Sequence, residues 1–158
     1  MFKNTAAYVR TFTLVHVSVY WVVGSLFYQI SGYEEALATM EVFQLYRPLE
    51  SISMVLVVFF GQIGRGALLS LLLYPFFKVL IQTKRAWLLM FGLLLGLQVL
   101  GSPLFADGFI SAEVATVGEF IESLVIGIPE IVVQTLVFSL LFVGLARRQA
   151  KTAGLQRT

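Results

Sequence analysis

The chain has 158 residues, of which 58% are hydrophobic and only 13% are charged, about half the charged share of a soluble globular domain. Its net charge of +2 is too small to indicate a polyanionic partner such as a nucleic acid, and it has no cysteine to form a disulfide or a thiolate metal site. These values exclude a disordered protein, a nucleic-acid-binding module and an ordinary soluble enzyme. They predict an all-α integral membrane protein whose first partner is the lipid bilayer.

The first predicted transmembrane span covers residues 11–30. Because it follows Lys3 and Arg10 and precedes an Ala-x-Ala pattern at 36–38, it also resembles a secretory signal whose cleavage would remove residues 1–38. A signal core has only about 7–15 apolar residues. This run is about 20 residues long, the length of a membrane span, and it contains bulky Tyr and Trp. We therefore expect it to be retained as a span.

A short helix and a long apolar block are predicted next. Residues 33–46 carry apolar side chains at helical spacing, which predicts a helix at the outer membrane interface. The apolar block over 52–81 has 30 residues and would extend about 45 Å as a helix, whereas the bilayer core is about 30 Å thick. It therefore either projects outward or breaks near 61–66, where three glycines weaken a helix. We favour an outer segment over 51–60, followed by a span over about 60–82.

A third span is predicted over residues 86–103 and a fourth over 127–146. Residues 116–119 fit a capping box, which predicts an outer helix leading into the fourth span. Pro129 would then either lie in the first turn of that span or kink a continuous helix. A basic cytoplasmic tail is predicted over 148–158.

Acidic and basic residues are separated along the chain. Eight of the nine acidic residues lie between the first and second spans or between the third and fourth. Nine of the eleven basic residues lie near the N-terminus, near the turn around Lys84 and Arg85, or in the C-terminal segment. Cytoplasmic segments collect Lys and Arg. We therefore predict a four-helix transmembrane bundle over residues 1–147 in the cell membrane, with both termini in the cytoplasm.

Three ionisable residues lie at membrane depth: His16, Arg65 and Glu130. Arg65 is 16 residues before Ile81 and Glu130 is 16 residues before Ala146, so both lie about 24 Å above the cytosolic ends of their spans. Because a charge in the membrane needs a partner, the equal depths predict an ion pair between Arg65 and Glu130. We favour a structural pair over a transporting or catalytic one, since no reactive neighbour accompanies it.

Three glutamines extend this pair into a polar cluster. Gln62 lies within one turn of Arg65, Gln134 lies one turn after Glu130, and Gln98 has the same predicted depth as Gln134. Ordinary hydrogen bonding between helices is the simpler interpretation. A small polar cavity that opens toward the outside is the alternative.

His16 could relay protons or ligate a metal or haem. A metal site needs several ligands, and the chain has no second His and no Cys, so we expect a hydrogen-bonded histidine, no metal and no cofactor. Small residues four apart predict close packing between helices. They are Gly92 with Gly96, and Gly66 with Ser70.

Three functions remain open. The favoured one is a small membrane protein that works by helix association, as a subunit, stabiliser or assembly factor, with another membrane protein or in a homo-oligomer. The second is an oligomeric transporter or channel that carries an anion, a proton or a small polar solute along Arg65, Glu130 and Gln134. The third is an intramembrane enzyme acting on lipid or isoprenoid, with Glu130 or Glu122 as its acid or base; its motifs are absent, so no catalytic residue is assigned.

Overall fold

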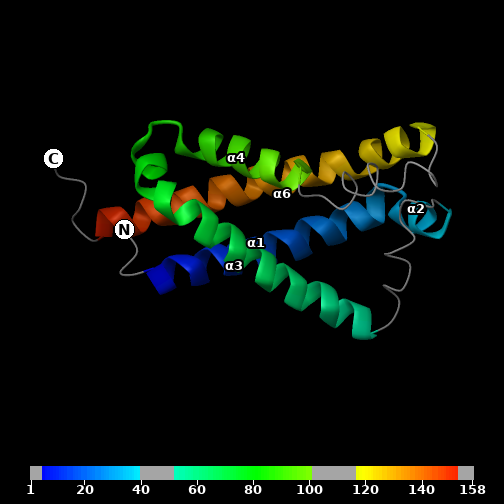
Figure 1. Ribbon diagram of the computed structural model, residues 1–158, viewed down its shortest axis with the longest axis horizontal. Coiled ribbons are helices and arrows are strands. Elements are labelled where there is room, and N and C mark those ends of the chain that lie inside the picture. Colours follow the sequence, from blue (N-terminus) through cyan, green and yellow to red (C-terminus); the bar gives the residue numbers. More distant parts are fainter. Residues whose placement is uncertain (1–4, 40–51, 101–116, 153–158) are drawn as a thin grey trace.

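The regular structure of the chain is helical. The computed structural model describes residues 5–39, 52–100 and 117–152, and every regular element in these ranges is an α-helix (Figure 1). The elements are α1 (Thr5–Ile30), α2 (Tyr33–Thr39), α3 (Ile52–Gln82), α4 (Ala86–Leu100) and α6 (Val117–Thr152). The predicted all-α class and the short helix that follows the first span are thereby confirmed for the described residues.

Three of these helices are long and apolar enough to cross a membrane. They are α1 over its whole length, the Val55–Gln82 part of α3 and the Leu124–Ala150 part of α6. Helix α4 is apolar over Ala86–Val99 but has 15 residues, which give about 22 Å against a bilayer core of about 30 Å. The last residues of the predicted third span, 101–103, lie outside the described residues.

The break predicted in the long apolar block does not occur. Helix α3 is continuous for 31 residues, through the glycines at 61, 64 and 66 and through Pro75. The three glycines predicted a weak helix at 61–66, but Gly66 packs tightly against α1, and this contact stabilises the helix. Helix α3 crosses α1 obliquely, and its first turns stand apart from the other helices (Figure 1).

Helix α6 is also continuous. It runs for 36 residues through Gly127 and Pro129, as the second of the two predicted alternatives requires. It begins at Val117, so Thr116 of the predicted capping box lies outside the described residues. It ends at Thr152, and residues 148–152 of the predicted tail are therefore helical.

The long helices alternate in direction, so the start of α1, the α3–α4 turn and the end of α6 lie at one end of the molecule (Figure 1). We call this the basic end. The guanidinium of Arg147 ties the turn to α6, because its Nη2 donates hydrogen bonds to the carbonyl oxygens of Thr83 (2.8 Å) and Lys84 (3.1 Å). The turn itself is closed by backbone bonds from Thr83 N–H to Leu80 O and from Ala86 N–H to Thr83 O.

Five aromatic rings fill the space between α1, α3 and α6 near the basic end. We call them the aromatic layer: Tyr8, Phe12, Phe77, Phe138 and Phe142. Their ring centroids lie 4.7 Å apart for both Tyr8–Phe77 and Phe12–Phe138, and 5.0 Å apart for Phe12–Phe142. All five side chains are buried, so this layer closes the interior at that level.

Candidate functional site

Polar side chains of three helices face one another on the far side of the aromatic layer from the basic end. On α1, His16, Tyr20 and Gly24 are spaced by four residues, which places them on one face of the helix. On α3, Gln62 and Arg65 are three apart, and on α6, Glu130 and Gln134 are four apart. We call these residues the polar layer; the members with polar side chains are His16, Tyr20, Gln62, Arg65, Glu130 and Gln134.

Contacts between α1 and α3 make up one half of the polar layer. The Nε2–H of buried His16 donates to Oε1 of Gln62 at 3.1 Å, and Gln62 is also hydrogen-bonded to the hydroxyl of Tyr20. Arg65 lies within electrostatic range of both His16 and Tyr20. His16 is thus a hydrogen-bonded histidine inside the helix packing, as predicted.

A glycine on α3 allows this close approach. A Cβ placed on Gly66 would lie 3.0 Å from His16 Cδ2 and 3.3 Å from the Thr13 Cα of α1. Because a backbone atom is involved, a side chain here would push the helices apart. One turn later Ser70 is completely buried, and its Oγ donates to the Ala67 carbonyl at 2.6 Å. The pair Gly66 and Ser70 therefore lies on a packed face.

The other half of the polar layer surrounds Glu130. The side-chain amide of Gln134 donates to Glu130 Oε1 at 2.6 Å, one turn along the same helix. The hydroxyl of Tyr33 is also hydrogen-bonded to the Glu130 carboxylate. Gly24 of α1 lies beneath this pair, since a Cβ there would be 3.2 Å from Glu130 Oε1 and 3.6 Å from Gln134 Nε2. Residues of α1, α2 and α6 thus surround the Glu130 carboxylate.

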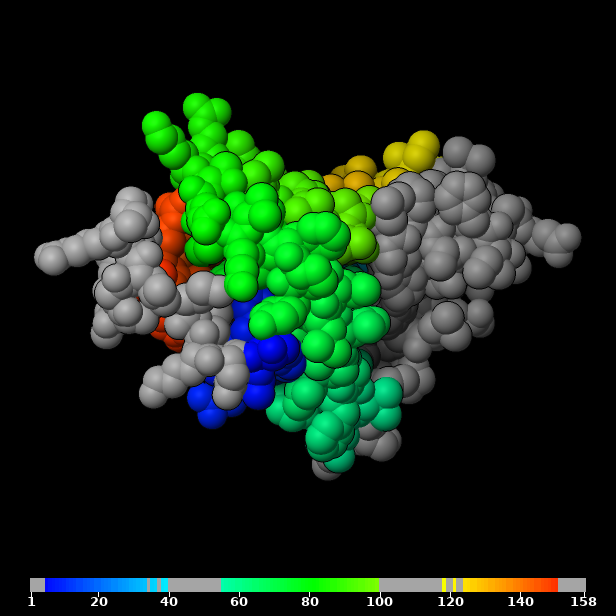
Figure 2. All heavy atoms as spheres, turned by 60° about the vertical axis from the view of Figure 1, so that its left-hand side comes forward, coloured from blue at the N-terminus to red at the C-terminus, as the bar shows by residue number. Residues whose placement is uncertain are grey.

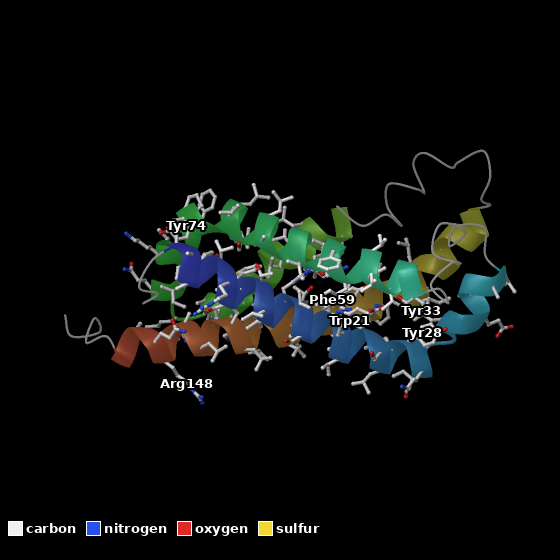
Figure 3. The ribbon with its side chains drawn as sticks, turned by 90° about the horizontal axis from the view of Figure 1, so that it is seen from below. Trp21, Tyr28, Tyr33, Phe59, Tyr74 and Arg148 are labelled. Carbon is white, nitrogen blue, oxygen red and sulfur yellow. The ribbon has the colours of Figure 1, made fainter. Side chains whose placement is uncertain are left out.

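Tyr33 reaches Glu130 because the chain turns sharply after α1. Gly32 adopts a positive φ of 67°, a conformation that a side chain disfavours. The turn is stabilised by bonds from Ser31 N–H to Phe27 O (2.9 Å) and from Ala36 N–H to Gly32 O (3.1 Å). Helix α2 therefore starts beside the end of α1, where Figure 3 places Tyr33.

Tyr20 lies within electrostatic range of both charges of the predicted ion pair. Its hydroxyl interacts electrostatically with both Glu130 and Arg65, so the two charged groups face a common neighbour. The partners of Glu130 given above are Gln134 and Tyr33. A direct contact between Arg65 and Glu130 stays a prediction.

The remaining predicted residues lie on α4. Gln98 is buried, in line with Ala86, Met90 and Leu94 at intervals of four residues. Gly92 and Gly96 lie elsewhere on the helix: a Cβ added to either would meet no described atom within 4 Å. The close contact expected at these glycines is therefore not made within the described part of this chain.

Sequence reasoning missed three members of the site: Tyr20, Gly24 and Tyr33. Tyr20 is one of several aromatic residues in an apolar span, and Gly24 and Tyr33 carry no charge that would mark them. The signal that could have found Tyr20 and Gly24 is their spacing of four and eight residues from His16, the one histidine of the chain.

The aromatic layer packs directly against the polar layer, on the side of the basic end. The rings of His16 and Phe138 are 6.2 Å apart and meet nearly edge to face, at 74°. Beyond Phe138 come the buried rings of Phe12 and Phe142. A polar solute that entered from the far end would meet closely packed aromatic rings before it reached the basic end.

Comparison with known proteins adds no further guide. No protein-family model, curated protein or solved structure matches the chain. Within the described residues, no three His, Asp or Glu side chains are gathered in a way that could hold a metal ion. The polar layer must therefore be interpreted from its own geometry.

Proposed function

We propose that this chain is an integral membrane protein that crosses the bilayer four times, with both ends in the cytoplasm, and that it acts by associating with another membrane protein as a subunit, stabiliser or assembly factor. The orientation follows from the basic residues at the end where α3 meets α4. The fourth crossing is supported by the alternating helix directions, which α4 continues (Figure 1). Helix α1 packs on both α3 and α6, which favours its retention over cleavage as a signal.

The observation that carries this proposal is the way the polar layer satisfies itself. Gln62 is hydrogen-bonded to both His16 and Tyr20, and Glu130 is hydrogen-bonded to both Gln134 and Tyr33. Hydrogen bonds of this kind hold helices in register inside a membrane. Together with the aromatic layer, they support a fixed scaffold rather than an open path through the chain.

A scaffold that works by association must offer a surface to its partner, and α4 is the best candidate. Its outward face carries Gly92 and Gly96, which have no neighbour within 4 Å in the described part of the chain, next to exposed Leu89, Leu93 and Leu97. Without side chains, the two glycines allow another helix to approach the backbone closely, the geometry in which helix pairs associate in bilayers.

The experiment is co-purification from native membranes with the full chain carrying a C-terminal tag. A partner membrane protein should be retained in a fixed ratio by the wild type and lost by Gly92→Leu with Gly96→Leu. Gly144→Leu is the matched control, because Gly144 of α6 also has no neighbour within 4 Å. Retention of no other protein after gentle cross-linking, or equal retention by both variants, contradicts the proposal.

A second function is favoured by one observation: Arg65 and Glu130, two ionisable groups, lie within candidate membrane spans and within electrostatic range of the same residue, Tyr20. Such groups commonly mark the paths of ions or protons. Because the aromatic layer closes the interior of one chain, a transporter would need several copies with a path between them. A ring-shaped oligomer whose liposome flux is lost in Glu130→Gln supports this function; a strict monomer, or equal flux from both proteins, excludes it.

A further inference from the structure

Helix α2 contacts an acidic group of α6 at the end of the molecule opposite the basic end (Figure 1). Its first residue, Tyr33, is hydrogen-bonded to Glu130, which lies inside the Leu124–Ala150 candidate span. One side of the short helix is packed, since Ala36 is only 5% exposed, whereas Ala38 is exposed. Helix α2 is thus docked on the bundle through one buried face and one hydrogen bond to a carboxylate.

The connection between α1 and α2 leaves the short helix dependent on these contacts. Gly32 joins the two helices with a φ of 67°, and a Cβ there would meet no described atom within 4 Å. Helix α2 has seven residues, too few to be stable as an isolated helix. Its docked position therefore requires side-chain contacts, and the described polar contact that links it to α6 is the bond from Tyr33 to Glu130.

The strength of that bond depends on the charge of Glu130. An ionised carboxylate accepts a hydrogen bond about twice as strongly as a neutral acceptor. When Glu130 takes up a proton, the Tyr33 hydroxyl loses its charged acceptor. The other bond to the carboxylate comes from Gln134 of the same helix and does not hold α2. Because the ionised form favours the docked helix, docking weakens as the pH falls through the titration of the carboxyl group.

The groups that face Glu130 from the other helices do not change charge in acid. Tyr20 of α1 is already neutral at pH 7, and Arg65 of α3, which acts on the same tyrosine, stays protonated. Helix α4 has no ionisable residue between Ala86 and Leu100.

Two further groups titrate in acid but do not act directly on Tyr33. Glu35 of α2 is exposed. His16 of α1 is hydrogen-bonded to Gln62, in the other half of the polar layer. Among the described side chains, the proton that bears on the Tyr33 bond is therefore the one taken up by Glu130.

Protons have a route to Glu130 from the side of α2. At the basic end, the start of α1 (blue), the α3–α4 turn (green) and the end of α6 (red) lie together (Figure 2). The aromatic layer closes the interior between them and the polar layer. In the topology proposed above, α2 lies on the outer side of the membrane.

We propose that α2 is a pH-sensitive latch, which is docked while Glu130 is ionised and is released when the outer medium becomes acidic and Glu130 is protonated. Release removes the Tyr33 hydroxyl and exposes the acidic group to outer water. The side that the latch senses rests on the proposed function and its topology, whereas the latch itself is a property of the fold.

The test measures how well docking shields a thiol introduced by Ala36→Cys, in a chain that has no cysteine of its own. Ala38→Cys is the matched control, because it makes the same change at an exposed position of the same helix. The ratio of the alkylation rates at 36 and 38 cancels the effect of pH on thiol reactivity. In detergent, this ratio should be well below one at about pH 8 and rise about five- to tenfold at about pH 4.5, a window that spans the ordinary titration of a carboxyl group.

Four variants assign the response. Glu130→Gln has no charge to lose and Tyr33→Phe has no hydroxyl to donate, so each should give a raised ratio that no longer changes with pH. Glu35→Gln alters an exposed carboxylate of α2, and Tyr28→Phe alters an exposed tyrosine near the end of α1 (Figure 3). Both should keep the wild-type response.

A ratio that does not change with pH in the wild-type background overturns the latch, and so does an unchanged pH response in Glu130→Gln. Tyr33 lies outside the candidate spans, so Tyr33→Phe still decides the question if Glu130→Gln does not fold. Amide exchange over residues 33–39 of the cysteine-free chain, corrected for the intrinsic effect of pH, must show the same release. It thereby detects a thiol at 36 that disturbs the packing. Because the assay needs neither a bilayer nor a partner, its failure leaves the proposed function untouched.

Discussion

Gly24 of α1 lies directly beneath the carboxylate of Glu130 on α6, where an added Cβ would be 3.2 Å from Glu130 Oε1. The absence of a side chain on one helix thus makes room for an acidic group on another. This relationship joins α1 to a carboxylate inside a candidate membrane span, where a charged group is costly and the hydrogen bonds from Gln134 and Tyr33 stabilise it.

A large side chain at Gly24 should therefore destabilise the protein. We expect Gly24→Leu to displace Glu130 from Gln134 and to cost about 1–3 kcal/mol, the range for overpacked sites. The measurement is the free energy of unfolding in mixed micelles. Gly144→Leu is the control, since that glycine faces open space; an equal loss in both variants contradicts the contact.

Gly66 offers a sharper comparison, because Gly64 lies two residues away on the same helix. A Cβ at Gly66 would lie 3.3 Å from the backbone Cα of Thr13, which cannot move aside as a side chain can, whereas a Cβ at Gly64 meets nothing within 4 Å. We expect Gly66→Ala to lower the free energy of unfolding by about 1–3 kcal/mol. Gly64→Ala should be neutral or stabilising by up to about 1 kcal/mol, owing to the better helix propensity of Ala.

The aromatic layer should carry much of the packing energy. Phe142 is fully buried and its ring lies near those of Tyr8, Phe12 and Phe138, whereas the neighbouring Leu141 is half exposed. We expect Phe142→Ala to cost about 3 kcal/mol or more, because a large cavity opens between three helices. Leu141→Ala should change the free energy of unfolding by far less. Similar losses would show that the layer is not packed as described.

The predicted pairing of Arg65 with Glu130 is tested by exchanging the charges. Arg65→Glu alone and Glu130→Arg alone should each reduce the folded yield, because each leaves two like charges at the same depth. The double variant should recover part of that loss if the groups interact across Tyr20. A double variant that is no better than the worse single variant excludes direct pairing, and each yield is measured by gel filtration in detergent.

Much of the fold was predictable from the sequence because bilayer thickness and charge placement act on whole segments. The three long apolar helices follow from the length of the apolar segments, and the α3–α4 turn at Lys84 and Arg85 follows from charge placement. The helix over the start of 33–46 follows from the helical spacing of its apolar residues. The continuity of α3 could not be predicted in this way, because three glycines and Pro75 weaken a helix. The packing of Gly66 on α1, which the sequence does not reveal, stabilises it.

The site was predictable only where a charge marked it. His16, Arg65, Glu130 and their glutamines are visible in an apolar sequence. In contrast, the sequence does not reveal which face of an all-apolar helix points inward, because lipid and the protein interior favour the same residues. Hence Tyr20 and Gly24 were found only when α1 was seen to pack against both α3 and α6.

The proposed four-span topology requires the whole basic end to lie on one side of the membrane. Because the chain has no cysteine, Lys84→Cys, Arg148→Cys and Glu35→Cys each introduce a single thiol. A membrane-impermeant thiol reagent applied to intact cells should label position 35 and leave 84 and 148 unlabelled until the membrane is opened. Labelling of 84 and 148 from opposite sides would contradict the proposed four crossings.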